Sequence, residues 1–255
     1  MASVTGVMKC WLLLICGLLV MDLEAFTLLS WNIHRGVGMD GKLDVERTAA
    51  VIREQKADVV LLQEVDQGTA RSGKRFLAKE LAERLGMHMF FGKAIDFQGG
   101  EYGQAILSVH PLRETRVVRL SEQGEARIAV LAEVKIGAEW VTVGGVHLDA
   151  ASAPRRLEEG KVLLKALAAS KGKMYLAGDW NEGPSDAVGQ MLQQAGWVYQ
   201  KKSGEPFSFP QEKPEIEIDF VFANGAEMAR ECRVVEVNGA SDHRAVVARW
   251  SVASP

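Results

Sequence analysis

Several short stretches of the sequence place carboxylate, carboxamide or imidazole side chains directly beside a run of β-forming residues. Glu64 follows one apolar run, Asp179 and Asn181 close another, and Asp242 and His243 precede a third. Clustered carboxylates are costly unless a cation or a protonated partner offsets their charge. The repeated pattern therefore predicts a site that brings a cation and several oxygen ligands together.

The candidate ligands share oxygen donors and a place beside a predicted strand: Asn32, Glu64, Asp179, Asn181, Asp219 and Asp242. Hard oxygen ligands suit Mg²⁺ or Mn²⁺, whereas Zn²⁺ would take more His or Cys. Mg²⁺ keeps open positions for water and phosphate oxygens. Such an ion beside His147, His243 and nearby arginines is typical of a site that binds a phosphate ester.

The segment MYLAGDWNEGPSD, residues 174–186, has two interpretations. Asp, Asn, Gly and Pro are the usual turn residues, so the segment is consistent with an ordinary turn after a buried strand. At the two-residue period of a strand, Asp179 and Asn181 would instead point to the same side, at the mouth of a sheet. The other polar strand ends have similar local explanations, and their number in one chain favours a site.

The residues that surround these positions predict the elements that carry them. Apolar and β-branched runs indicate strands over residues 26–34, 57–66, 139–149, 174–183, 215–224 and 240–250. Helical spacing predicts helices over residues 44–55, 75–85, 154–170 and 185–195. Segments 126–136 and 139–147 are typical of a hairpin. We expect an α/β sandwich of mixed sheets covered by helices.

The first 25 residues differ from the rest of the chain. One Lys, a twelve-residue apolar run and a small residue at Ala25 are typical of a secretory signal peptide. The apolar run is short for a membrane span. We expect a signal peptide over residues 1–25, or a membrane anchor if it stays uncleaved, and one domain over residues 26–255. The protein would then be secreted or periplasmic.

Cysteine content and charge limit the partners. Cys10 and Cys16 lie in the leader, which leaves Cys232 alone in the mature chain, and no disulfide-linked partner is indicated. Without residues 1–25 the chain has 29 basic and 31 acidic residues, a net charge of −2. This balance does not suggest tight non-specific binding to nucleic acid, although a local basic groove stays open. A monomer is expected.

An ordered series of motifs resembles the endonuclease/exonuclease/phosphatase superfamily: SWNIHRG, LLQEVD, GGEYGQAILS, GGVHLD, LAGDWNEGPS, IDFVF and SDHRAV. That group holds pancreatic-type deoxyribonucleases, exonuclease-III-like repair enzymes, neutral sphingomyelinases and inositol-polyphosphate 5-phosphatases. The resemblance covers about Phe26 to Trp250. It implies a four-layer α/β sandwich, with two packed mixed β-sheets flanked by helices, and a Mg²⁺-dependent or Mn²⁺-dependent phosphoester hydrolase.

The resemblance also implies roles for the matched residues. Asp179 would orient or deprotonate the attacking water, and Asn181 would bind the phosphate oxygens. Glu64 would be the principal metal ligand, helped directly or through water by Asn32 and Asp242.

Further matches concern the phosphate pocket. His243 would contact the scissile phosphate, while Asp219 would hold its tautomer and stabilise its cation. His147 resembles the second phosphate-contacting His of the nuclease and phosphatase branches, which weighs against an abasic-site role. Tyr102 and Arg127 match residues that line the pocket in relatives, with a packed aromatic and a surface Arg as the alternatives.

Two positions depart from the family pattern. Gln104 stands where the loop usually has Asn, so a substrate contact could shift. Glu217 stands where an Arg often precedes the Asp of the IDFVF motif, so a cation near the site would be missing. Trp31 and Trp180 are expected in the core, while His34 and Arg35 either face the substrate or cap the turn through Gly36.

The leading functional prediction is a secreted, Mg²⁺-dependent phosphoester hydrolase, and a phosphodiesterase in particular, whose partner is its phosphoester substrate. The substrate stays open between nucleic acid, a phospholipid head group as in sphingomyelinases, and a small phosphodiester. A non-catalytic binding protein that retains the fold is the alternative from another class.

Overall fold

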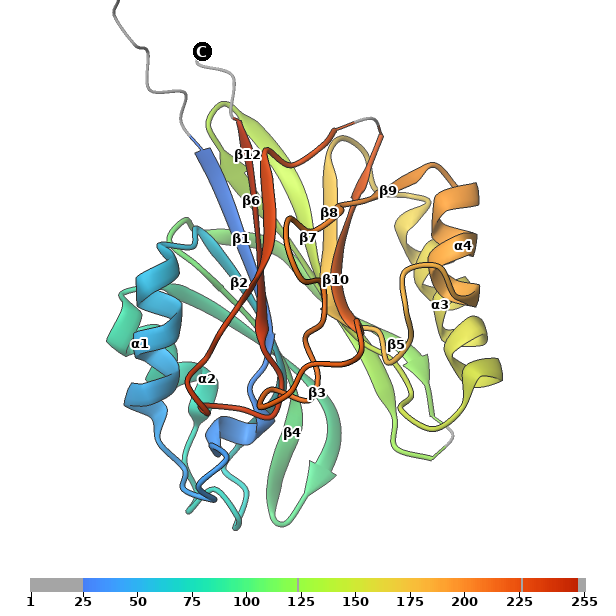
Figure 1. The fold of residues 1–255 in the computed structure, drawn as a ribbon. Coiled ribbons are helices and arrows are strands. Elements are labelled where there is room, and N and C mark those ends of the chain that lie inside the picture. The colour runs from blue at the N-terminus through green and yellow to red at the C-terminus, as the bar shows by residue number, and fades with distance from the viewer. Residues whose placement is uncertain (1–24, 123, 226, 252–255) are drawn as a thin grey trace, which may run out of the picture.

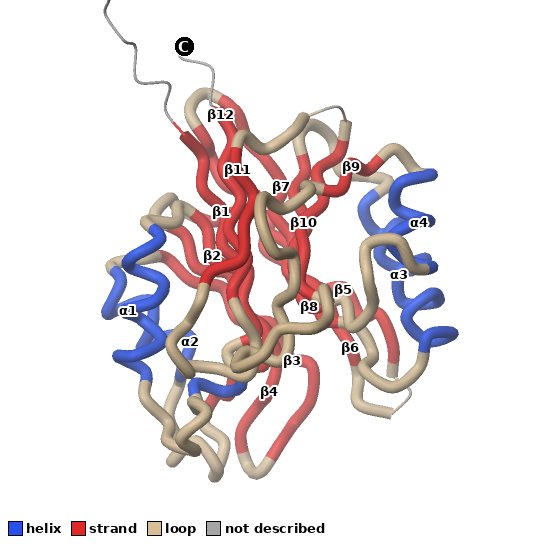
Figure 2. Tube along the Cα trace, viewed as in Figure 1, coloured by secondary structure: helices blue, strands red, loops and turns tan. Residues whose placement is uncertain are grey.

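The computed structural model describes residues 25–122, 124–225 and 227–251, so the predicted signal peptide lies outside the described residues except for Ala25. Two six-stranded sheets pack face to face, and helices cover both outer faces (Figure 1). Figure 2 shows the same layering, with the strands in the centre and the helices on the flanks. The predicted α/β sandwich of two mixed sheets flanked by helices is confirmed.

The first sheet is mixed, because β1 runs parallel to β2 and antiparallel to β12. In sheet order its strands are β11 (Glu231–Val235), β12 (Ala245–Ser251), β1 (Ala25–Asn32), β2 (Val59–Gln67), β4 (Gly100–Ser108) and β3 (His88–Phe97). The β1–β2 pair is the feature that matters for function, since parallel strands end at the same edge of the sheet. Asn32 and the C-terminal part of β2 therefore meet at one edge.

The second sheet repeats this arrangement, with β7 parallel to β8 and β10 antiparallel to β8. In sheet order its strands are β5 (Leu112–Ser121), β6 (Arg127–Ile136), β7 (Glu139–His147), β8 (Met174–Asp179), β10 (Asp219–Asn224) and β9 (Trp197–Tyr199). The predicted hairpin is β6–β7. His147 and Asp219 both stand opposite Asp179 in the strand register.

The helices form where their sequences predict them. They are α1 (Val45–Gln55), α2 (Leu77–Leu85), α3 (Ala153–Leu167) and α4 (Ala187–Gln194), with a short 3₁₀ turn η1 (His34–Gly36). Asp44 caps α1 by accepting a hydrogen bond from the Arg47 amide. Both α3 and α4 are shorter than predicted. Asp186 accepts from the Gly183 amide, which closes the turn ahead of α4.

The hydrophobic core follows the alternation of the strands. Leu61 and Val130 point into the layer between the two sheets. Their neighbours Leu62 and Leu131 point outward, toward α1 and α2 or toward α3 and α4. Each such fully buried side chain contributes roughly 1.5–3 kcal/mol to folding. These three apolar layers, one between the sheets and one under each pair of helices, fix the position of one sheet edge relative to the other.

Three local findings refine the sequence analysis. Trp31 and Trp180 lie in the core as predicted, and both are fully buried. The strand predicted to open with Asp242 and His243 begins instead at Ala245, because the Ser241 hydroxyl accepts from the His243 amide and donates to the Asn32 carbonyl. Over the described ranges, none of the helices combines the length and apolar character needed to cross a bilayer.

Candidate active site

The polar strand ends of the two sheets converge on one cavity of about 400 Å³. Strands β1, β2, β7 and β8 end there, while β10 and β12 start there. Predicted site residues that line the cavity are Glu64, Tyr102, Arg127, His147, Asp179, Asn181, Asp242 and His243. Asn32 and Asp219 lie directly behind this lining and contact it by hydrogen bonds.

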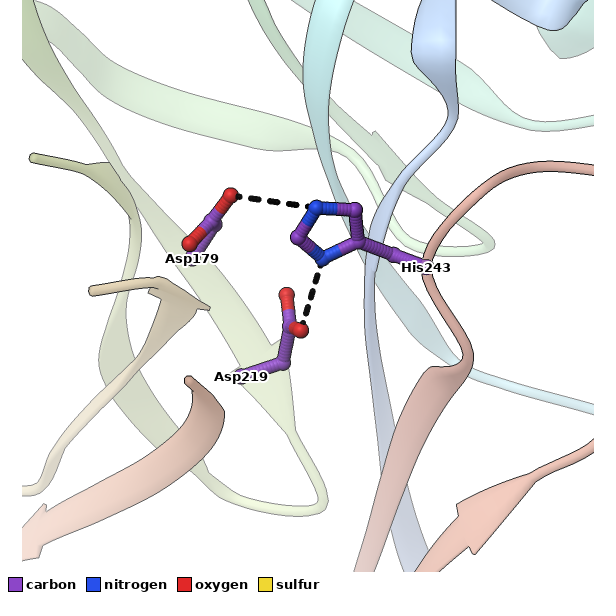
Figure 3. A group of neighbouring side chains, drawn as sticks. All are labelled: Asp179, Asp219 and His243. Atoms are coloured by element: carbon purple, nitrogen blue, oxygen red, sulfur yellow. Dashed lines mark hydrogen bonds and ion pairs between the residues drawn. The ribbon is translucent and has the colours of Figure 1, made fainter. Parts of the chain in front are cut away.

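His243 stands between two buried carboxylates (Figure 3). Its Nδ1 lies 2.8 Å from Asp219 Oδ2, and its Nε2 lies 3.7 Å from Asp179 Oδ2. Burial alone would lower the pKa of this imidazole, but the carboxylates of Asp219 and Asp179 outweigh it and raise the pKa to about 10. His243 is therefore an imidazolium at neutral pH, held with one N–H toward the cavity.

Besides His243, two other residues hold Asp219 in place. The Ser208 hydroxyl donates to Asp219 Oδ2 at 2.6 Å, and the buried Lys202 ammonium donates to the Asp219 carbonyl at 2.7 Å. Lys202 also forms an ion pair with Glu217. Lys202, 15 residues before Glu217, supplies a buried positive charge beside it but does not line the cavity. The expected lack of a cation at the phosphate pocket therefore stays a prediction.

Asp179 lies at the floor of the cavity with both oxygens engaged. Its Oδ1 accepts from the Asn181 amide at 3.0 Å, and its Oδ2 accepts from Asn32 Nδ2 at 3.1 Å. Burial, followed by the charge of Asp219, raises the pKa of Asp179 to about 7, despite the opposing effect of His243. A carboxylate with a pKa near neutrality suits a general base.

Asn181 reaches the same cavity by a route that differs from strand alternation. Strand β8 ends at Asp179, and Asn181 adopts a left-handed backbone conformation with φ of +54°. Its side-chain amide donates to the Leu148 carbonyl at 3.0 Å, which holds it at the cavity wall. The turn interpretation of this segment is therefore confirmed. Asn181 lies at the cavity as well, although the strand period that predicted this stops at Asp179.

Glu64 is turned into the cavity by a bulge in β2. The pairing register of β2 with β4 shifts between Leu62 and Val65, and Glu64 has a φ of +57°. Bulges of this kind re-aim a side chain. The Glu64 carboxylate accepts one hydrogen bond, from Asn32 Nδ2 at 3.2 Å, which leaves its other oxygen facing the cavity.

The residues on the Glu64 side fit a hard divalent cation. Glu64 and Asp242 offer carboxylate oxygens that line the cavity. The Asn32 oxygen accepts from the His34 amide, so Asn32 orients the carboxylates rather than facing an ion with its oxygen. Asp179, Asp219 and His243 also bring ligand-type atoms within 4.8 Å of one another. A protonated imidazolium has no free lone pair, however, which favours Glu64 and Asp242 as the ligands of a divalent cation.

His147, Arg127 and Tyr102 form the opposite wall. His147 Nε2 lies 3.5 Å from Asp179 Oδ2, and Arg127 Nη1 lies 3.3 Å from the His147 ring nitrogens. Burial, together with the charge of Arg127 and then of His243, lowers the pKa of His147 well below its usual value. Burial raises the pKa of Tyr102. His147 and Tyr102 are therefore neutral groups that can hydrogen bond to a phosphate.

Gln104 does not line this cavity. Its amide nitrogen donates to the Ile128 carbonyl at 2.6 Å, which holds the side chain behind Tyr102 and Arg127. His34 lies beside the site, where its amide donates to Asn32 and its ring lies 3.9 Å from Asp242. The turn interpretation of His34 is the one that these contacts favour.

Sequence reasoning missed Lys202, Ser208, Phe209 and Arg71. Phe209 packs 4.7 Å from the His243 ring, centroid to centroid, and Arg71 lines the cavity. None of them stands in a motif that marks function by itself. A signal exists for Arg71, which follows the LLQEVD motif closely, and for Ser208 and Phe209, which stand in the SFP segment ahead of the IDFVF motif.

Comparisons with solved structures place this architecture among known folds. An endonuclease/exonuclease/phosphatase structure from Beutenbergia cavernae has a TM-score of 0.73 and 25% identity, covering 89% of this chain and 72% of that chain. The mannosyl-6-phosphatase Bt3783 of Bacteroides thetaiotaomicron has a TM-score of 0.73 and 15% identity, covering 88% and 98%. Truncated TDP2 of Caenorhabditis elegans has a TM-score of 0.67 and 18% identity, covering 91% and 100%.

The sequence comparisons agree with the fold. No curated protein matches the chain by sequence. Residues 29–243 match the Endonuclease/Exonuclease/phosphatase family. Its members are metal-dependent hydrolases of phosphoester bonds, which is the chemistry that the converging carboxylates and the imidazolium suit. The chain belongs to the endonuclease/exonuclease/phosphatase family.

Proposed function

We propose that this protein is an exported, Mg²⁺-dependent phosphodiesterase that acts on a small substrate. The observation that carries the proposal is the position of Asp179. Its carboxylate lies on the cavity floor, aligned by Asn32 and Asn181 and flanked by His147 and His243. A base held so tightly can orient one water molecule toward a phosphorus atom.

The surrounding residues have complementary tasks in an in-line attack. Asp179 orients the water and accepts its proton, since its raised pKa makes it an effective base. The His243 imidazolium and the Asn181 amide stabilise negative charge that develops on the phosphoryl oxygens. Asp219 keeps His243 protonated and correctly oriented. Neutral His147 offers a further hydrogen bond.

Glu64 and Asp242 would hold the Mg²⁺, with Asn32 orienting Glu64. When bound, the ion supplies neutralising charge to the phosphoryl and leaving-group oxygens. A divalent ion also compensates the carboxylates that would otherwise repel an anionic substrate at this edge of the cavity.

The charge of the cavity favours a small monoanionic ester over nucleic acid. Four carboxylates line the cavity, against two guanidinium groups and His243. Both guanidinium groups are paired, Arg71 with Asp66 and Arg127 with Glu125. Nuclease contacts to successive phosphates need unpaired basic groups along a groove. A phosphodiester, with one negative charge, adds less repulsion here than a dianionic monoester does.

A phosphate monoester of a sugar is the second candidate substrate. The mannosyl-6-phosphatase Bt3783 has the same fold over 98% of its own chain. Since 15% identity shows the fold alone, this likeness only nominates a substrate class for testing.

The test uses purified residues 26–255 beside the Asp179→Asn variant. Hydrolysis is followed over plasmid DNA, RNA, sphingomyelin and phosphatidyl lipids, small phosphodiesters and sugar monoesters, with Mg²⁺ or with EDTA. We expect turnover of small diesters that EDTA abolishes and that Asp179→Asn loses. The matched control is Asp186→Asn, in the turn just after the site, which should keep wild-type rates.

Undiminished activity in Asp179→Asn would disprove the mechanism, and turnover of DNA, lipid or monoesters alone would reassign the substrate. A folded wild-type protein that hydrolyses nothing in the panel would support a binding role.

Export is a separate part of the proposal and rests on residues 1–25. Expression of the full chain should release a protein that lacks this segment, which N-terminal sequencing of the exported fraction would reveal. Recovery of the intact chain in the membrane fraction would indicate an anchor instead.

A further inference from the structure

Part of the cavity lining consists of groups that the hydrolytic mechanism does not use. Arg71, Ile95, Phe97 and Phe209 line the cavity beside the catalytic residues. The guanidinium carbon of Arg71 lies 4.4 Å from the Phe97 ring centroid and 5.4 Å from that of Tyr102. These lining residues therefore combine apolar surface with one arginine that lies over aromatic rings.

Arg71 is fixed by a buried carboxylate. Its Nε and Nη2 each donate to Asp66 at 2.8 Å, one to each oxygen. Asp66 is fully buried and also accepts from the Thr69 hydroxyl. A bidentate pair with a buried partner is rigid and directional.

The loop that carries Arg71 is joined to the β3–β4 turn. The Arg71 amide donates to the Gln98 side chain at 3.0 Å, and the Ala70 amide donates to the Gln98 carbonyl at 3.0 Å. Lys74 Nζ donates to the Gly99 carbonyl at 3.1 Å. Arg71 and Phe97 are therefore held in a set relation before any substrate enters.

The exposed edge of the guanidinium is available to a ligand. Among the described residues, Arg71 Nη1 makes no hydrogen bond, and about 29% of the side chain is accessible. Because Asp66 compensates the charge of Arg71, the ion pair as a whole is neutral, while Nη1 still offers N–H donors. Such a group suits neutral oxygen acceptors more than it suits a second anion.

The remaining cavity supports the same conclusion. A second anionic group on the substrate would meet Glu125, which lines the cavity and is not among the proposed metal ligands. Hydroxyl groups carry no such penalty, and the C–H faces of an aliphatic ring can pack on Phe97 and Phe209. These lining residues thus offer a partner for both kinds of surface on a polyhydroxylated ring, N–H donors for its hydroxyl groups and aromatic rings for its C–H faces.

We propose that Arg71, Phe97 and Phe209 form a subsite for a hydroxylated, uncharged part of the substrate, such as the ring of a sugar phosphoester. The proposal rests on the proposed function, since it names the group attached to the phosphate that the catalytic residues attack. Arg71 Nη1 would donate to substrate hydroxyls, so Arg71 sets specificity without taking part in bond breaking.

The test compares substrates that differ only in hydroxyl groups. The 6-(methyl phosphate) diester of a hexose is paired with hexyl methyl phosphate, which has the same charge and the same scissile bonds. For the wild-type protein we expect kcat/KM to be about 10- to 100-fold higher for the hexose ester. The hexyl ester has no hydroxyl groups, so it would leave the polar groups of the subsite without hydrogen-bond partners. Arg71→Gln should remove most of this preference, because it should lower kcat/KM for the hexose ester far more than for the hexyl ester.

Control variants separate a subsite from a structural role. Since Arg71→Gln leaves buried Asp66 unpaired, the double variant Asp66→Asn/Arg71→Gln replaces the ion pair by an amide pair and should show the same loss of preference. Arg113→Gln is the matched control. Arg113 also stacks on an aromatic ring, Trp140, and pairs with a carboxylate, Glu133, but does not line the cavity. It should keep the wild-type preference.

Binding measurements keep this test independent of hydrolysis. Hexose 6-phosphate and hexyl phosphate are titrated calorimetrically into the Asp179→Asn protein, with and without Arg71→Gln. Tighter binding of the hexose ester that Arg71→Gln abolishes would support the subsite even if no phosphoester were hydrolysed, in which case only the proposed function would fall. Equal affinity for the two ligands, or an equal loss for both in Arg71→Gln, would overturn the subsite.

Discussion

The two halves of the site differ in how many hydrogen bonds and ion pairs the protein supplies to their charged groups. On one side, His243 and Asp219 are buried and held by Ser208 and Lys202. On the other side, Glu64 accepts one hydrogen bond from the described residues, and Asp242 lies partly exposed at the cavity. In the first half, Asp219 Oδ2 is hydrogen bonded by Ser208 and His243, while Asp219 Oδ1 is buried without a partner among the described residues. The second half presents carboxylate oxygens with few donors.

This difference indicates how the chain divides the work of catalysis. Buried charges are tolerated only when they are paired and hydrogen bonded, and the imidazolium half meets that condition. The Glu64 half would be costly without a cation, which is the condition under which a metal ion binds. We therefore expect the two halves to respond differently to substitution, to added Mg²⁺ and to pH.

The largest loss of activity should come from substitutions at the catalytic base and at the imidazolium. Asp179→Asn and His243→Ala should each lower kcat/KM by about 10³-fold or more, since they remove the base or a charged donor to the phosphoryl group. Steady-state kinetics at saturating Mg²⁺ measure this loss. His88→Ala, on exposed β3, is the control and should keep wild-type kinetics. A variant of Asp179 or His243 that retained wild-type rates would refute the roles assigned to this half.

The support behind the imidazolium half can be broken without touching the cavity. Lys202→Met leaves the half-buried Glu217 without its cation and should lower the free energy of unfolding by about 3–5 kcal/mol. Urea denaturation measures this change. Lys202→Met/Glu217→Gln should recover a large part of it. Lys213 pairs with Glu215 on the surface, so Lys213→Met should cost less than about 1 kcal/mol. Equal losses for the two lysine variants would contradict the buried-pair interpretation.

The metal half should respond to added ion. Glu64→Gln and Asp242→Asn should raise the Mg²⁺ concentration needed for half-maximal activity by about 10- to 100-fold. High Mg²⁺ should restore part of the rate in these variants and none in His243→Ala. Activity titrated against Mg²⁺ tests the contrast directly. Rescue of His243→Ala by Mg²⁺ would show that the division between the halves is wrong.

The smallest effect concerns pH. The folded-state pKa of His243 is raised to about 10, so the stabilisation of its imidazolium is fully present below about pH 6.5 and lost as pH rises through about 10. Activity should fall over that upper range. Asp219→Asn should move the alkaline limb down by about one pH unit or more, because it removes the main carboxylate that holds the proton. The pH profile of kcat/KM measures the limb, and an unmoved limb would assign it to another group.

Some elements of this molecule were predictable because they depend on local pattern. The apolar runs of β2 and β8 and the Asp44 cap of α1 were each readable from neighbouring residues. The start of β12 was not, because Ser241 bonds to Asn32, which is remote in sequence, and so delays the strand to Ala245. Local periodicity carries no information about such long-range hydrogen bonds.

The departures from the family pattern show the same limit. Glu217 alone suggested a missing cation, and the ion pair that Lys202 makes with it could not be predicted from Glu217. Gln104 suggested a shifted substrate contact, but its amide bonds to the Ile128 carbonyl behind the cavity. In both cases the residue type was read correctly, and its partner could not be known before the chain was folded.

The amino-acid sequence by itself determined the helices, the strands that carry the site and the kinds of groups at their ends, because these follow from composition and period along the chain. Only the tertiary structure decided which of those groups meet. Asn32 joins Glu64 to Asp179, and Asp66 presents Arg71 to the cavity. The physical reason is that the packing of two sheets places the strand ends together, and the carboxylates then select the hydrogen-bond donors within reach.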